Sequence, residues 1–389
     1  MNSLLNNKLF VIYVAPFILG AITILGFAPF NLTFLNFLTF SVLLFLILNL
    51  KEKTKSKYRK KKSNKYFFYQ GCAFGFGFFL FGNYWISISL THDDMFIGLI
   101  PLAVLLIPLF LSLFFGLAIY IVGPFSNKNI SFILLFSIFF TLLEFLRGNI
   151  LTGFPWNLIS YTWWWSLESI QVLSFIGTYS LSLISITIFC IPFLFFQKKI
   201  FKKNIIFLLI FLLIIISNYS YGLIKINKNK YLYDDKISVK IVSPNFSLKD
   251  YYESSEISQI EKLIKISDPQ KDRKTLFIWP EGIFYESYLA DITKYKDLFE
   301  KKFSKNHLII MGINNYDNFQ NTNEKKYFNS LVVLNNKLDI LSLYNKVYLV
   351  PFGEFLPFEK YLSKIGLKKV TPGYSSFSPG NIRKEIKLD

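Results

Sequence analysis

The chain of 389 residues is too apolar for an ordinary soluble protein: 52% of its residues are hydrophobic, 19% are aromatic, and its mean hydropathy is +0.39. Its formal net charge of +18 would suit a nucleic-acid partner, but the basic residues include only four arginines, the residue that nucleic-acid readers favour for bidentate base contacts (Arg59, Arg147, Arg273, Arg383). Much of the charge falls in short lysine blocks between long apolar stretches, so we expect a membrane protein and no nucleic-acid partner.

The first part of the chain is divided into apolar stretches long enough to cross the hydrocarbon core, which takes about 20 helical residues. The first stretch leads through the turn Phe27–Phe30 straight into the second, which favours an uncleaved hairpin over a signal peptide. We predict about seven membrane helices in a domain of residues 1–222: Phe10–Gly26, Leu32–Leu50, Tyr66–Leu90, Phe96–Gly123, Ile130–Phe145, Ser169–Phe196 and Ile205–Tyr221.

The loops between these helices alternate in charge. Lys51–Lys65 carries nine basic residues and Gln197–Asn204 carries four, whereas Phe27–Asn31 and Thr91–Met95 carry none. Because cytoplasmic loops are basic, we expect the N-terminus to be cytoplasmic. Seven spans then deliver the rest of the chain to the outer side.

Residues 223–389 differ in character, because charge rises and short β-branched runs appear. Between these runs, Glu256–Ile266 and Ile292–Phe303 carry apolar residues at helical spacing, which indicates an α/β layer arrangement. Asn335-Asn336 between the last two runs predicts a hairpin turn. The expected strands are Ile237–Val242, Thr275–Trp279, His307–Met311, Ser330–Leu334 and Leu338–Leu343.

Two strings in this part place charged residues where strands end. Trp279-Pro280-Glu281-Gly282 follows the apolar run from Thr275, and YNKVYLVPFGEFLPF (344–358) contains Lys346 and Glu354. A carboxylate can act as a general base, and a lysine can stabilise a developing oxyanion in acyl transfer through a cysteine. Each residue alone has an ordinary alternative: Glu281 could cap a helix, and Lys346 could be a solvated strand lysine.

Taken together, the strings resemble the carbon–nitrogen hydrolase (nitrilase) superfamily, and most closely its membrane branch, the bacterial apolipoprotein N-acyltransferases. Further strings resemble that family's first membrane turn, its periplasmic loop and its hydrolase domain: GFAPF (26–30), EFLRGNILTGFPW (144–156), Phe328-Asn329-Ser330 and SSFSPG (375–380). The order of spans, outer domain and motifs agrees with the resemblance.

The resemblance implies a multi-span helical membrane domain followed by an α/β nitrilase-like (αββα) domain at residues 223–389. It implies transfer of a fatty acyl chain from a phospholipid to the N-terminal amine of the diacylglyceryl-cysteine of a lipoprotein, through a cysteine thioester. Glu281 would be the base, Lys346 the oxyanion-stabilising ammonium and Glu354 a supporting glutamate. The implied location is the bacterial inner membrane, with the C-terminal domain periplasmic and no metal or organic cofactor.

The chain departs from the family at the nucleophile. Its two cysteines, Cys72 and Cys190, lie in predicted membrane spans near the inner side, where cysteine usually acts as a small hydrophobic residue. The family's cysteine follows the segment that resembles SSFSPG, and the chain ends at Asp389. We therefore expect a hydrolase domain that is incomplete at its C-terminus and a chain that forms no acyl-enzyme.

Two polar groups near the predicted spans are further candidates. His92, Asp93 and Asp94 could hold a metal, but an exposed loop is favoured because a third kind of ligand is lacking. Glu144 and Arg147 are three residues apart at a helix end, so they can form an interfacial ion pair or contact a substrate headgroup. We also predict that the nearby Phe154 and Trp156 contact the substrate.

Two other classes of function stay open. A transporter with a soluble tail is disfavoured, since the spans carry few ionisable residues apart from Glu144. Another membrane-fused, amide-processing enzyme of the same superfamily is permitted by the fold, and only the strings in the membrane domain argue against it.

Overall fold

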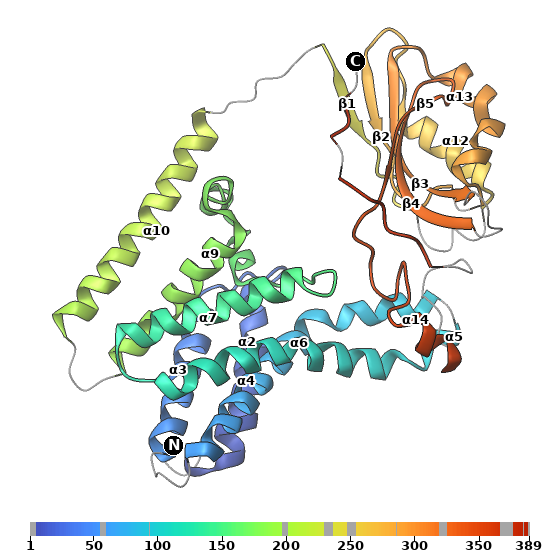
Figure 1. Cartoon of the computed structure of the whole chain (residues 1–389). Helices are drawn as coiled ribbons and strands as arrows, with labels where there is room; N and C mark the ends of the chain where they lie inside the picture. Colours follow the sequence, from blue (N-terminus) through green and yellow to red (C-terminus); the bar gives the residue numbers. More distant parts are fainter. Residues whose placement is uncertain are drawn as a thin grey trace. The chain divides into compact units, whose positions relative to one another are not determined.

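The structure, a computed structural model, describes residues 5–54, 60–92, 94–196, 201–228, 236–246, 254–284, 286–318, 325–365, 376–383 and 385–387. It consists of two compact units, Met1–Lys230 and Tyr231–Asp389. The first is helical, and the second contains a sheet with helices (Figure 1). The predicted order, a multi-span helical membrane domain followed by an α/β domain, is confirmed.

The described part of the first unit contains six helices that are long and apolar enough to cross a membrane, so the chain is a multi-pass membrane protein. The predicted span at Phe10–Gly26 forms a shorter apolar helical segment that includes α2 (Ala15–Thr23). The long spans contain α3 (Leu35–Lys53), α4 (Lys60–Asn83), α6 (Ile100–Val122), α7 (Ile130–Asn149), α9 (Leu173–Cys190) and α10 (Lys202–Lys228). The short helices α5 (Asp94–Ile97) and α8 (Leu167–Ile170) lie between them.

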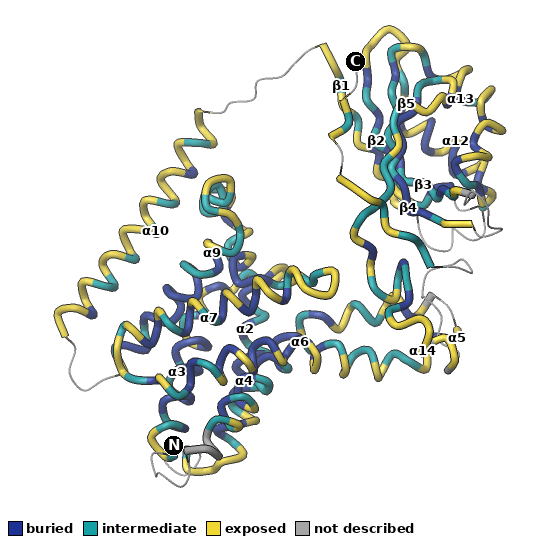
Figure 2. Tube along the Cα trace, in the orientation of Figure 1, coloured by how far each residue is buried: buried dark blue, intermediate teal, exposed yellow. Residues whose placement is uncertain are grey.

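Phenylalanine rings fill the core of the first unit, where helices from distant parts of the sequence meet. Phe40 of α3 packs edge-on against Phe140 of α7 and stacks on Phe189 of α9, and all three rings are buried. α2 and α4 approach each other closely because they meet at glycines: a Cβ on Gly20 would lie 2.0 Å from the Phe74 carbonyl oxygen. Figure 2 shows the contrast with α10, which is exposed along most of its length.

The sheet of the second unit has the strand order β1-β2-β3-β4-β5. Its strands are β1 (Ser238–Ile241), β2 (Thr275–Ile278), β3 (His307–Asn318), β4 (Lys325–Leu334) and β5 (Ile340–Asn345). The first three strands are parallel, and their connections carry α12 (Glu256–Ser267) and α13 (Lys296–Lys302). The other pairs are antiparallel, and the turn predicted at Asn335-Asn336 joins β4 to β5.

Two helices cover one face of this sheet. These are α12 and α13, and on that face Phe277, Ile309 and Val332 join a buried core (Figure 1).

β3 and β4 are both longer than predicted, because their pairing continues to Asn318 and Lys325. These extensions carry polar residues whose alternation gives no apolar signal in the sequence. They place Gly312 and Asn329 beside the turn that follows β2.

The short helix α14 (Glu359–Leu362) follows the turn that contains Glu354.

Candidate functional site

Glu281 lies in the turn after β2, where the chain leaves the sheet. The Trp279 N–H still donates to the Ile310 carbonyl at 2.8 Å, and its indole is buried in the core. Two residues later Glu281 is exposed and lies beside Gly312 of β3. A Cβ at position 312 would approach the Cα and Cγ of Glu281 to 3.0 Å. Glycine therefore leaves the space that this glutamate occupies against the sheet.

Lys346 follows the end of β5, and the backbone fixes its position on both sides. Its N–H donates to the Asn329 carbonyl at 2.9 Å, and its own carbonyl accepts from the Gly380 N–H at 2.8 Å. Its ammonium donates to Glu354 Oε1 at 2.7 Å, and the lysine side chain is 35% exposed. A lysine held in this way is a fixed positive charge that a ligand can still reach.

Glu354 is fixed more firmly than either of the other two. It lies in a tight turn in which the Val350 N–H donates to Glu354 Oε2 at 2.7 Å and the Glu354 N–H donates to the Val350 carbonyl at 2.8 Å. The Phe377 N–H donates to its carbonyl at 2.8 Å. Its side chain is 10% exposed. One carboxylate oxygen of Glu354 thus accepts from the backbone and the other accepts from Lys346.

Asn329 of β4 joins these side chains and is the residue that sequence reasoning missed. Its Nδ2 donates to Glu281 Oε1 at 2.6 Å and to Glu354 Oε1 at 2.7 Å. A primary amide has two N–H groups, so one Asn329 side chain can bridge two carboxylates without a proton between them. We call Glu281, Asn329, Lys346 and Glu354 the carboxylate–amide cluster. Phe328-Asn329-Ser330 was noted in the sequence only as a string that resembles the hydrolase domain.

The cluster has a chemical asymmetry. Lys346 neutralises Glu354 directly, whereas Glu281 has only the neutral amide of Asn329 as its hydrogen-bond partner among the described residues. Glu281 is also the exposed carboxylate of the two. An exposed carboxylate that is held in place can accept a proton from a bound reactant, and an ammonium nearby can stabilise negative charge on an oxygen.

A second buried carboxylate, Glu256, anchors the segment that follows Glu281. Glu256 lies in the first turn of α12 and is 1% exposed. It accepts hydrogen bonds from the Glu286 N–H at 2.8 Å and from the hydroxyls of Ser287 and Tyr295. Burial and the hydrogen bond to Glu256 raise the pKa of the Tyr295 hydroxyl above its ordinary value of 10.0. These contacts attach the segment that follows the Glu281 turn to α12.

Glu144 and Arg147 form a pair in the first unit, with Arg147 Nη2 lying 4.0 Å from Glu144 Oε1. Both side chains are buried. Arg147 Nη1 donates to the Phe154 and Trp156 carbonyls, each at 2.7 Å, and Glu144 Oε1 accepts from the Ile159 N–H at 3.1 Å. The pair therefore clamps the loop that follows α7.

The clamped loop has an unusual backbone, since Leu151, Thr152 and Asn157 all adopt positive φ angles. It presents Trp156, which is 49% exposed and lies 5.2 Å from the Trp85 ring. Phe154 is half-buried. The predicted substrate contacts of Glu144, Arg147, Phe154 and Trp156 stay a prediction, and in this arrangement only the two aromatic side chains are accessible.

Neither cysteine of the sequence lies in the second unit. Cys72 is half-buried in α4, and Cys190 is buried at the end of α9. The predicted alternative of a metal at His92, Asp93 and Asp94 falls partly outside the described residues, since Asp93 is not among them. Among the residues that the structure describes, no group of three metal-binding side chains occurs.

These units define a class of protein: a multi-pass membrane protein that carries a nitrilase-like α/β domain. A model of the apolipoprotein N-acyltransferase N-terminal domain matches residues 19–191. The apolipoprotein N-acyltransferase of Brucella melitensis is 30% identical over 388 residues, covering 96% of this chain and 71% of the relative. That of Rickettsia typhi is 31% identical over 370 residues, covering 94% and 70%.

The enzyme of the same name from Rhodopseudomonas palustris is 27% identical over 385 residues, covering 96% of this chain and 71% of the relative. The chain belongs to the apolipoprotein N-acyltransferase family, which is a family of enzymes. The predicted resemblance is confirmed, and the relatives extend over more sequence than this chain.

Proposed function

We propose that the carboxylate–amide cluster is the base and cation site of a reaction that moves a fatty acyl chain from a phospholipid to the N-terminal amine of diacylglyceryl-cysteine in a lipoprotein. Glu281 is the general base, Lys346 stabilises the oxyanion, and Glu354 and Asn329 hold them in place. The observation that carries the proposal is the pair of hydrogen bonds from one Asn329 amide to Glu281 and Glu354, which joins residues far apart in sequence.

The proposed reaction has two steps with one intermediate. A cysteine thiol loses its proton to Glu281, and its sulfur attacks the ester carbonyl carbon of the phospholipid. The carbonyl oxygen becomes an oxyanion beside Lys346, the C–O bond breaks, and the departing lysophospholipid oxygen takes the proton from Glu281. The acceptor amine then attacks the thioester carbonyl carbon and loses a proton to Glu281, the C–S bond breaks, and the departing cysteine sulfur takes that proton from Glu281.

The nucleophile of this reaction is assigned to neither Cys72 nor Cys190. Both lie in membrane helices of the first unit, and Cys190 is buried. A cysteine in such surroundings behaves as a small apolar side chain. We therefore expect this chain alone to form no acyl thioester, although it carries the proposed base and cation.

The proposed location follows from the loop charges. The basic blocks between spans support an orientation with the N-terminus in the cytoplasm and the second unit in the periplasm of a bacterial inner membrane. Cysteines introduced one at a time at Ser3 and at Ser254, in a chain whose two natural cysteines are replaced by serine, test this. Only the cysteine at position 254 is expected to react with an impermeant maleimide added outside.

The experiment that tests the function uses two proteins. One is this chain, and the other is a chimera that adds the part of the Brucella melitensis relative outside the aligned region. Each is incubated with phospholipid radiolabelled in its acyl chains and a diacylated lipoprotein peptide. The proposal predicts triacylated peptide with the chimera and no hydroxylamine-sensitive label on this chain. Release of ammonia from an amide substrate, without acyl transfer, would instead support an amide-processing enzyme.

A further inference from the structure

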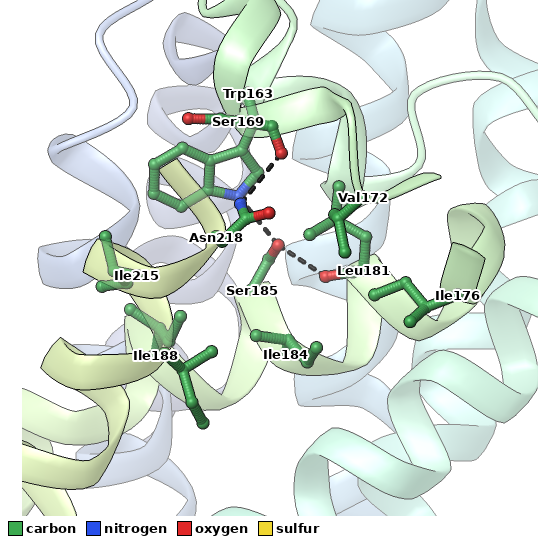
Figure 3. A pocket seen from close by; sticks show the side chains of 11 residues that line it. Trp163, Ser169, Val172, Ile176, Leu181, Ile184, Ser185, Ile188, Ile215 and Asn218 are labelled. Carbon is green, nitrogen blue, oxygen red and sulfur yellow. Dashed lines mark hydrogen bonds between the residues drawn. The ribbon is translucent and has the colours of Figure 1, made fainter. Parts of the chain in front are cut away.

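A small crevice lies in the first unit, between α9, α10 and the indole of Trp163 (Figure 3). Its volume is about 70 Å³. Most of its wall is aliphatic, and the lining includes Trp163, Ile184, Ile188, Ile214, Ile215 and Asn218. The lining contains no charged side chain, so the crevice offers nothing to a phosphate or a carboxylate.

The crevice arises from the way in which α9 and α10 are held. Gly177, with φ 76° and ψ 171°, interrupts α9, and lining residues come from both sides of this break. α10 is fastened at the crevice, where Asn218 Nδ2 donates to the Ser169 carbonyl at 2.9 Å, and farther along, where Lys225 Nζ donates to the Gln171 carbonyl at 3.4 Å. Only 6% of the apolar stretch of α10 is buried.

The polar atoms in the wall are mostly satisfied by the protein itself. Trp163 Nε1 donates to Ser185 Oγ at 2.8 Å, and Ser185 Oγ donates to the Leu181 carbonyl at 2.6 Å (Figure 3). Of the polar side-chain atoms in this wall, the Asn218 oxygen alone lacks a donor among the described residues, and it is not accessible. A water molecule in the crevice would have few partners, and water needs two to four.

We propose that this crevice binds a segment of an alkyl chain of a membrane lipid. Both helices span the bilayer, and Ile214 at the rim is exposed, so hydrocarbon surrounds the entrance. A helix is about 10 Å wide and does not fit, whereas an alkyl chain does. The volume admits only part of a chain, since an apolar cavity of about 150 Å³ is what holds one benzene. This site does not depend on the proposed reaction.

Photo-crosslinking tests the proposal on the whole chain in phosphatidylcholine vesicles. The probe is phosphatidylcholine with a diazirine midway along one acyl chain, and adducts are located by mass spectrometry. Ile184→Trp and Ile215→Trp fill the crevice from its two walls. The matched control is Ile216→Trp, because Ile216 is 62% exposed on the lipid side of α10. Adducts on the exposed Leu105 and Leu109 of α6 serve as the internal reference.

We expect adducts on Ile188 and Ile214 in the unchanged chain. Either filling substitution should lower them roughly tenfold against the α6 reference, because each displaced methylene contributes about fourfold to binding. Ile216→Trp should leave them unchanged. If neither filling substitution alters the adduct yields on Ile188 and Ile214, the adducts come from lipid around the protein and not from lipid in the crevice. That result would overturn the proposal.

Discussion

The two units each contain a carboxylate beside a cation, yet they use the pair in opposite ways. In the membrane unit, Glu144 and Arg147 are both buried, and their hydrogen bonds go to the backbone of one loop. In the second unit, Lys346 is 35% exposed and pairs with the buried Glu354. Asn329 joins Glu354 to Glu281, and Glu281 is exposed.

The difference in burial separates charged side chains that stabilise the structure from charged side chains that a reactant can contact. Buried charges must be paired and hydrogen-bonded, because removing them from water costs several kcal/mol each. The hydrogen bonds of Arg147 to the Phe154 and Trp156 carbonyls, and of the Ile159 N–H to Glu144, offset part of that cost and fix the loop. An exposed carboxylate meets no such cost and can exchange protons with a ligand. The same two kinds of charge thus serve a clamp in one unit and a candidate site in the other.

The largest expected effect comes from breaking the clamp. Arg147→Ala leaves Glu144 buried without its partner, so we expect a loss of about 3–5 kcal/mol in the stability of the membrane unit. Thermal unfolding in detergent measures it, with the exposed Arg273→Ala as the matched control. The double variant Glu144→Gln/Arg147→Met should recover part of the loss. If Arg147→Ala unfolds at the same temperature as Arg273→Ala, the clamp is not structural.

Gly312→Ala should disturb the candidate site next most strongly. The added methyl group would lie about 3.0 Å from Glu281 atoms, which forces the turn after β2 to shift. Overpacking of this kind costs about 1–3 kcal/mol. Hydrogen exchange of peptides that cover residues 279–284 should speed up, while exchange in α4 stays constant. Unchanged hydrogen exchange in residues 279–284 would show that the position of the Glu281 turn does not depend on the space that Gly312 leaves.

Asn329→Leu tests the bridge between the two carboxylates. Removing the amide leaves Glu281 and Glu354 without their shared donor, with an expected cost of about 1–3 kcal/mol for the second unit. Urea unfolding at pH 7 measures the loss. An Asn329→Leu chain that is as stable as the unchanged chain would contradict the bridging role.

The smallest expected effect is at Tyr295, whose hydroxyl donates to Glu256. Because the pKa of Tyr295 is raised in the folded chain, its contribution is complete below pH 10 and is lost as the pH rises through the folded pKa. Tyr295→Phe should therefore cost about 1 kcal/mol at pH 8. The gap to the unchanged chain should narrow above pH 10. Proteolysis of the second unit at pH 8 and pH 10.5 measures both, and a constant gap would contradict the assignment.

The sequence predicts the elements of both units better than the contacts between them. The hydropathy of α3 to α10 and the apolar runs of β1 and β2 are local signals, and the structure follows them. The polar ends of β3 and β4 carry no such signal, because their pairing depends on register. Asn329 was missed for that reason: its position next to Glu281 follows from the longer hairpin.

The pairing of Glu144 with Arg147 could be predicted from their spacing on one helical turn, but the burial of both side chains could not. Arg147 is buried because the loop folds back so that the Phe154 and Trp156 carbonyls reach its guanidinium. That return needs positive φ angles at Leu151 and Thr152, residues that rarely adopt them. Local sequence preference therefore argues against the very loop that gives Arg147 its partners.

The most direct test of the central claim compares Glu281→Gln with Glu144→Gln in the chimera that carries the remaining sequence of the Brucella melitensis relative. Acyl transfer from radiolabelled phospholipid to a diacylated peptide is measured for both. Glu281→Gln should lower the rate by about 100-fold or more, because a general base contributes roughly that much. Glu144→Gln should retain most of the rate per folded molecule. Equal losses in the two variants, or an active Glu281→Gln protein, would show that Glu281 is not the general base.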